Sequence, residues 1–308
     1  NFFELGGHSL LTVQLIQKIN NTFKNKKLEL IDVVSLETIH KQAILLDTSS
    51  VRKASKHLIN FNLTEEQGID VVDTFIIPGM TGIAEGYYEL AESYSKEGGN
   101  VYGIQMYGLL EGEVGYSSIE DMAKHNIDII KSLPCKTIRL VSHSYGGVVV
   151  FEMVKQLLKE SITTKEIILL DSYLPKALLR VKEKAHIFIV TMLNMLNIKI
   201  AKKDILKFVE ATIKKTKKDR ANFIYEELKN KGGKIEKTFF TRLYTLCYNA
   251  LSISYKVEGQ FNETAVLVRA KQVDQKNVEI NQDWSPYFKT IQVIESSGNH
   301  FEMVREPF

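Results

Sequence analysis

The sequence predicts an α/β protein built around a mostly parallel β-sheet. From about residue 57, short runs rich in β-branched residues alternate with helical stretches, a pattern typical of βαβ units. The alternation stops between residues 172 and 256, where the chain is helical and rich in lysine, and then resumes. A helical insertion within such a sheet indicates a cap or lid. The predicted strands lie at 71–77, 101–106, 137–142, 166–170, 265–270 and 290–296.

The N-terminal region has helical patterns only. A helix expected at 9–24 places four apolar residues on one stripe, Leu11, Leu15, Ile16 and Ile19. We expect three regions along the chain. They are a partial small helical-bundle domain at 1–47, a linker and first strand region at 48–68, and the main domain at 69–308 with its lid at about 172–256.

Composition excludes several classes of protein. The net charge is only +3, from 40 basic and 37 acidic residues, so neither nucleic acid nor an anionic membrane is an expected partner. Cys135 and Cys247 belong to no metal-ligand cluster, and we expect reduced thiols and no metal site. The longest apolar run, at 186–200, is interrupted by polar residues and is too short to span a bilayer. We therefore expect a soluble, cytoplasmic protein.

Ser144 lies at a junction between a predicted strand and a predicted helix, in TIRLVSHSYGGVVVF. Such a turn is typical of a nucleophile elbow, which requires small residues two before and two after the serine. Gly146 meets this requirement. Ser142 replaces the usual glycine but is small enough to be tolerated. The helix start directs free N–H groups at the site, and the Tyr145 N–H is expected to bind an oxyanion.

A nucleophilic serine needs a histidine base and an orienting carboxylate. His300 follows the last predicted strand and is the expected base. His186 lies in the lid, and His125 is expected on a solvent-facing helix surface. Two acids are possible. Asp171 ends the strand after the nucleophile's strand and emerges from five apolar residues, which favours it over Asp274 in the polar stretch KQVDQKN.

The second oxyanion donor is expected in the loop after an early strand, FIIPGMTG. The backbone N–H of either Gly79 or Met80 is suitable, and the sequence does not distinguish them. With Ser144, Asp171 and His300 in this order along the chain, the pattern is that of the α/β-hydrolase fold, a mostly parallel sheet with helices on both faces and a helical lid.

Ser9 begins a predicted helix after two glycines. Its default role is an N-cap, although a phosphodiester would also be favoured at a helix start. However, NFFELGGHSLL closely resembles the attachment motif of peptidyl carrier domains in nonribosomal peptide synthetases, and LIDVVSLETIHKQA resembles the last helices of that domain. The resemblance covers only the back part of the carrier domain. It implies 4'-phosphopantetheine attached covalently to Ser9 by a phosphopantetheinyl transferase.

The rest of the chain resembles the terminal thioesterase domain that follows such a carrier. The similar segments are FIIPGMTG, VYGIQMYGLLEG, SHSYGG, LLDSYLP and DWSPYF…SSGNHFEMV. The resemblance supports Asp171 as the acid and His300 as the base. It implies release of an acyl or peptidyl chain from the carrier through Ser144, by hydrolysis or cyclisation, after upstream condensation and adenylation domains. The alternatives are a stand-alone carboxylesterase and a non-catalytic carrier or docking module.

Overall fold

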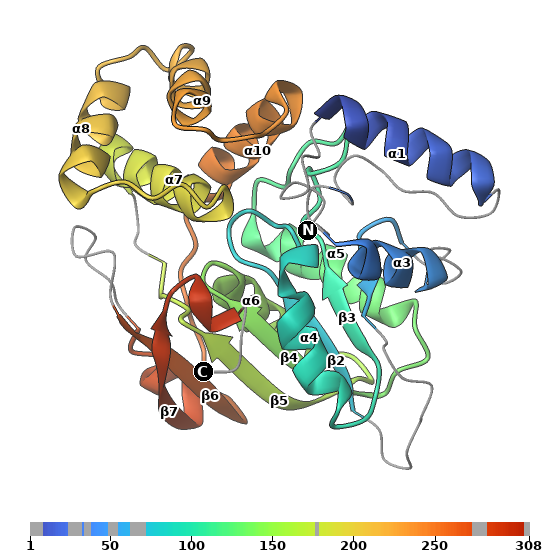
Figure 1. The fold of residues 1–308 in the computed structure, drawn as a ribbon. Coiled ribbons are helices and arrows are strands. Elements are labelled where there is room, and N and C mark those ends of the chain that lie inside the picture. The colour runs from blue at the N-terminus through green and yellow to red at the C-terminus, as the bar shows by residue number, and fades with distance from the viewer. Residues whose placement is uncertain are drawn as a thin grey trace.

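A computed structural model of the protein describes residues 9–23, 33, 38–48, 55–61, 72–175, 179–272 and 282–304. Its centre is a seven-stranded sheet in the order β1-β3-β2-β4-β5-β6-β7 (Figure 1). The strands are β1 (Leu58–Asn60), β2 (Asp73–Ile77), β3 (Val101–Ile104), β4 (Thr137–His143), β5 (Thr163–Leu170), β6 (Phe261–Gln272) and β7 (Phe288–Asn299). Only β1 runs antiparallel to its neighbour, so the predicted α/β architecture with a mostly parallel sheet is confirmed.

Helices cover both faces of the sheet. They are α4 (Tyr88–Ser95), α5 (Ile119–Lys131) and α6 (Gly146–Leu157). Alternate residues of β2 show how the two cores form: Phe75 and Ile77 pack in the cluster that contains α5 and α6, whereas Ile76 packs in the cluster that contains α4. A strand buried on both faces needs a continuous apolar run, and this requirement explains the sequence TFII.

The region between β5 and β6 forms a helical lid. Its helices are α7 (Val181–Met195), α8 (Lys202–Ile213), α9 (Arg220–Asn230) and α10 (Lys237–Ala250), which gather beyond one edge of the sheet in Figure 1. Phe188, Phe240 and Leu243 are buried in a cluster that joins the lid to Met80 and Leu109 of the sheet domain. The lysine-rich residues 214–219 form an exposed connection between α8 and α9.

Before the sheet, the described residues include the helices α1 (Ser9–Thr22) and α3 (Ile39–Thr48). Leu15, Ile16 and Ile19 of the predicted stripe pack against buried Val33 and Leu46 in a separate small cluster. Residues 1–8, which carry most of the NFFELGGH motif, lie outside the described residues. Across the part of the chain that the structure describes, every helix is too short or too polar to cross a membrane.

Candidate active site

Ser144 occupies a strained turn at the carboxyl end of β4. Its φ is +54°, in the left-handed region that a non-glycine residue rarely adopts. The Ser144 N–H donates to the Leu170 carbonyl at 2.9 Å, which ties the turn to β5. Helix α6 begins two residues later at Gly146, where a Cβ would lie 2.6 Å from the carbonyl oxygens of Ile77 and Pro78. Only glycine fits there, as the elbow pattern requires.

Ser142 replaces the first glycine of the pattern without disturbing the turn. It is fully buried in β4, and its hydroxyl donates to the Ile168 carbonyl of β5 at 3.3 Å. The extra polar atom is therefore satisfied within the sheet. This departure from the usual motif therefore adds one hydrogen bond between β4 and β5 and leaves no unsatisfied hydroxyl.

Asp171 follows β5 directly and is surrounded by donors. It is buried and adopts a φ of +40°. Oδ2 accepts from His300 Nδ1 at 2.6 Å and from the Tyr173 hydroxyl at 2.5 Å. Oδ1 accepts from the Gln282 amide at 2.7 Å and the Ala270 N–H at 3.1 Å. Burial favours the protonated acid, but His300 and the other donors outweigh burial and lower the pKa of Asp171 to about 2.

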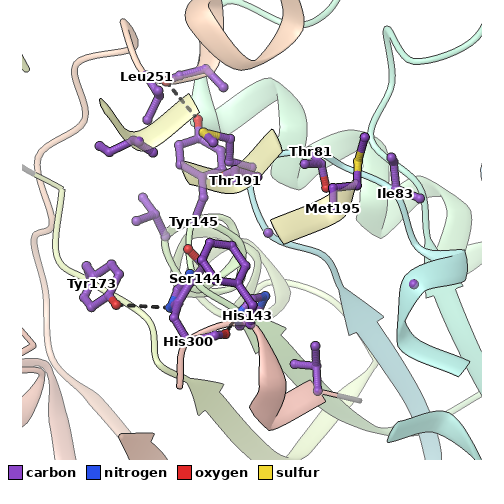
Figure 2. Close-up of a pocket in the computed structure, with 18 of the residues that line it drawn as sticks. Thr81, Ile83, His143, Ser144, Tyr145, Tyr173, Thr191, Met195, Leu251 and His300 are labelled. Atoms are coloured by element: carbon purple, nitrogen blue, oxygen red, sulfur yellow. Dashed lines mark hydrogen bonds between the residues drawn. The ribbon is translucent and has the colours of Figure 1, made fainter. Parts of the chain in front are cut away.

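His300 follows β7 and is buried beside this carboxylate. Its Nδ1 faces Asp171, so Nε2 is the ring nitrogen available to the serine. Tyr173 stacks on the imidazole, with ring centroids 5.5 Å apart and planes 17° apart. Ser144 and His300 line the same cavity, and Figure 2 shows the two side by side above the carboxyl ends of the strands. The structure thus brings together all three residues predicted to form the triad.

The loop after β2 distinguishes the two predicted oxyanion donors. The Gly79 N–H already donates to the Tyr87 hydroxyl at 2.8 Å. The Gly79 carbonyl accepts from the Gly82 N–H at 2.9 Å, so the Met80 N–H at the other end of that peptide points the opposite way. Within the described residues, the N–H groups of Met80 and Tyr145 donate to no protein acceptor, and both residues line the cavity. The geometry therefore favours Met80 and Tyr145.

The cavity beside Ser144 has a volume of about 270 Å³ and lies under the lid. Thr191 and Met195 of α7 and Leu251 after α10 form its far wall (Figure 2). Of the described residues that line it, none is a lysine, arginine, aspartate or glutamate. Nor do the described residues contain a group of three or more histidine, cysteine or acidic side chains that could hold a metal ion.

Four other residues named in the sequence analysis are not part of the proposed triad. His125 is half-buried and not on a fully solvent-facing surface: its ring lies against His57, and its Nδ1 forms a hydrogen bond with the Tyr116 hydroxyl at 3.2 Å. His186 is buried in α7 and does not line the cavity. Asp274 lies outside the described residues. Ser9 is the first residue of α1, and no acidic residue occupies the first turn of that helix.

Three contributors were not anticipated from the sequence: Tyr87, Tyr173 and Gln282. Tyr173 lies two residues after the acid in LLDSYLP, a proximity that could have identified it. Tyr87 lies in a short 3₁₀ helix eight residues after Gly79, and Gln282 reaches Asp171 from a loop 111 residues away. No local pattern marks either of them.

Comparison with known proteins agrees with this geometry. Residues 74–307 match the thioesterase domain family, and residues 1–46 match the phosphopantetheine attachment site family. Indigoidine synthase from Streptomyces lavendulae is 33% identical over 158 residues, which is 51% of this chain and 12% of that protein. A dimodular nonribosomal peptide synthase from Bacillus subtilis is 28% identical over 183 residues, 59% of this chain and 7% of that protein. The chain thus spans only a small part of these relatives.

Solved structures share the fold. A holo four-domain nonribosomal peptide synthetase bound to AMP and glycine aligns with 99% of this chain and 23% of its own, with a TM-score of 0.66 and 19% identity. The Vlm2 thioesterase domain with a bound dodecadepsipeptide aligns with 82% of this chain and 93% of its own, with a TM-score of 0.57 and 20% identity. A strained serine elbow, a buried acid–histidine pair and a helical lid on a mostly parallel sheet accompany these matches. The chain belongs to the thioesterase domain family of the α/β-hydrolase fold. Within the chain, this domain follows a phosphopantetheine attachment segment of the kind found in nonribosomal peptide synthetases.

Proposed function

We propose that this chain releases an acyl or peptidyl group from a carrier thioester at the end of a nonribosomal peptide synthetase. Ser144 is the nucleophile, His300 the general base and Asp171 the orienting acid. One observation carries the proposal: a buried Asp171–His300 pair, joined at 2.6 Å, lies at the same cavity as a serine held in a strained turn.

The first step forms an ester on the serine. His300 Nε2 takes the hydroxyl proton as Ser144 Oγ attacks the thioester carbonyl carbon. Asp171 holds the Nδ1 proton, which fixes the tautomer that leaves Nε2 basic, and its charge stabilises the imidazolium. The N–H groups of Met80 and Tyr145 bind the developing oxyanion. Each such donor typically contributes about 3–4 kcal/mol of transition-state stabilisation.

Loss of the thiol completes the ester, and a second attack then releases the product. His300 returns its proton to the departing sulfur, the carbon–sulfur bond breaks, and the acyl group remains on Ser144 Oγ. Either water or an amine or hydroxyl group of the bound acyl chain then attacks the ester carbonyl carbon, with His300 taking its proton. The carbon–Oγ bond breaks as His300 gives that proton to Ser144 Oγ, which frees the product and restores the serine. Attack by water gives hydrolysis, and attack from within the chain gives a macrocycle.

Ser9 is the proposed attachment point for 4'-phosphopantetheine, which supplies the thiol that carries the acyl group. One observation supports this role. It begins α1, and a helix N-terminus without acidic residues in its first turn favours an attached phosphodiester. A phosphopantetheinyl transferase and upstream condensation and adenylation domains are the proposed partners. Both cysteines are free thiols, which supports a cytoplasmic location.

The cavity supports a substrate class as well. Since its described lining holds no lysine, arginine or carboxylate, a charged acyl group would lose its hydration without gaining a partner. Ile187, Met195 and Ile253 instead offer apolar contacts. We therefore propose that the part of the acyl chain nearest the thioester carbonyl is uncharged and largely apolar.

Intact mass measurement tests the proposed function. The protein is incubated with a phosphopantetheinyl transferase and octanoyl-CoA, as wild type, Ser9→Ala and Ser144→Ala. The wild type should gain the acyl arm and then lose its acyl group. Ser144→Ala should keep the acyl group, since removing a triad nucleophile typically lowers the rate about a millionfold. Ser9→Ala should gain no arm.

Two results would reject parts of this proposal. If this segment gains no arm even within a full-length carrier domain, Ser9 is not an attachment site, and a simple carboxylesterase becomes the better explanation. If a fluorophosphonate probe fails to label Ser144, the domain is a non-catalytic carrier or docking module.

A further inference from the structure

A chain of hydrogen bonds outside the predicted triad joins the connection after β2, the end of β4 and the residue after β7 around Ser144. The Gly79 N–H donates to the Tyr87 hydroxyl at 2.8 Å. The Tyr87 oxygen lies 2.8 Å from His143 Nδ1, and His143 Nε2 lies 2.8 Å from the His300 carbonyl oxygen. Tyr87, His143 and His300 are all buried. Direct hydrogen bonds therefore connect the loop after β2, the end of β4 and the backbone of His300.

The position of every proton in this chain follows from its ends. A carbonyl oxygen only accepts, so His143 Nε2 must carry a hydrogen. Burial, helped by the neighbouring His300, lowers the pKa of His143 to about 3, so the ring is neutral and Nδ1 has a free lone pair. Burial also raises the pKa of Tyr87, whose hydroxyl stays protonated and donates to Nδ1. The same oxygen accepts from Gly79. One arrangement satisfies all the groups.

This chain fixes the two groups that the reaction needs in place. It holds the backbone N–H of Gly79, the residue before Met80. The N–H of Met80 is the proposed oxyanion donor. The fit is close, because a Cβ at Gly79 would lie 3.3 Å from His143 Nδ1 and 3.5 Å from Ser144 Cβ. It also anchors the backbone of His300, and the His143 ring packs on the His300 ring with centroids 4.6 Å apart. In Figure 2, His143 and Tyr173 flank His300.

We propose that Tyr87 and His143 are positioning residues for acyl transfer, which hold the Met80 N–H and the His300 imidazole relative to Ser144 Oγ. The inference rests on the proposed function. His143 suits this role because it stays neutral: a cationic ring at that distance would oppose the charge that His300 acquires when it takes the serine proton. A histidine adjacent to the nucleophile thus acts through its neighbours and not as the base.

The test compares Tyr87→Phe and His143→Leu with a matched control. The control is Tyr255→Phe, because the Tyr255 hydroxyl also donates one buried hydrogen bond, to Glu152 Oε2 at 2.7 Å, and Tyr255 does not line the cavity. For each variant we would measure kcat and KM for p-nitrophenyl butyrate, the inhibition constant of phenylboronic acid, and the melting temperature. The boronate forms a tetrahedral anion on the serine, so it reports the oxyanion donors directly.

Both test variants should lower kcat and weaken boronate inhibition together, by about 10–100-fold, somewhat less than outright loss of one oxyanion donor. KM should change less than about threefold, since the ground-state ester makes little use of these donors. Tyr255→Phe should lower the melting temperature comparably and leave both other quantities unchanged. His143→Gln, which keeps a side-chain N–H for the His300 carbonyl, should recover part of the lost kcat.

Two failures can be told apart. If the wild type shows no turnover and no fluorophosphonate labelling that depends on Ser144, the proposed function is wrong and the inference falls with it. If the wild type depends on Ser144 but Tyr87→Phe and His143→Leu behave like Tyr255→Phe, the function stands and these two residues are merely structural.

Discussion

Replacing Asp171 with asparagine should disable the base without emptying the site. The carboxylate accepts four hydrogen bonds, two on each oxygen. An amide keeps only one acceptor oxygen. That oxygen should stay at the Oδ1 position, because the Ala270 backbone N–H there can only donate. The new NH2 group then faces His300 Nδ1 at 2.6 Å, where the carboxylate oxygen was.

The expected magnitude follows from this reversal. To avoid two donors facing each other, His300 must accept at Nδ1 and carry its proton on Nε2, and in that tautomer it cannot take a proton from Ser144. Losing the correct tautomer in a serine triad typically lowers kcat about 10⁴-fold, which corresponds to about 5.5 kcal/mol. Binding should be little affected, because Asp171 does not line the cavity.

The assay is kcat and KM for p-nitrophenyl butyrate at pH 7.5, with melting temperature measured in parallel. Asp283→Asn is the matched control, since that carboxylate is exposed and bonds locally to Ser285. It should retain wild-type kcat. A loss in Asp171→Asn of less than about tenfold would refute the reasoning, and Asp274→Asn would then be the variant to measure.

Three further predictions concern stability and specificity. Gly146→Ala places a methyl group 2.6 Å from two backbone oxygens and should destabilise the protein by about 1–3 kcal/mol in urea unfolding, whereas Gly86→Ala, with nothing within 4 Å, should not. The pKa of Asp171 is lowered from 3.8 to about 2, so its carboxylate contributes stability above pH 4 that is lost as the pH falls toward 2. In urea unfolding over this window, the wild type should therefore lose stability more steeply than Asp171→Asn. Thr191→Trp should fill the far end of the cavity and lower kcat/KM for an octanoyl thioester, relative to an acetyl one, by more than about tenfold, whereas Thr245→Trp on the exposed face of α10 should leave this ratio unchanged.

The three proposed triad residues were predictable because each stands where a local pattern changes. Ser144 and Asp171 directly follow apolar strands, and His300 follows the last strand. Because these strands are parallel, all three residues lie at the carboxyl ends of the strands. Tyr87 and Gln282 were not predictable in this way. Gln282 reaches Asp171 from a loop that only the folded chain brings close, and Tyr87 contacts Gly79 only because the connection between β2 and α4 folds back on itself.

The fold shows the same division between local and long-range information. The core strands were found from their apolar runs, but β1 has only three residues and pairs antiparallel at the sheet edge, too short for any periodicity. His125 was misplaced because a helix surface that covers another part of the protein has the same local pattern as one that meets solvent. Its partner His57 lies in the segment that contains β1.

The lid packs largely around its own aromatic and aliphatic side chains, such as Phe188 and Phe240, and meets the sheet domain at few buried positions, Met80 and Leu109 among them. Segments with their own core can open and evolve as units. A lid from another thioesterase could therefore be exchanged for this one if the contacts at Met80 and Leu109 were kept. Substrate preference can in this way diverge within the thioesterase domain family while the strand ends that carry Ser144, Asp171 and His300 stay unchanged.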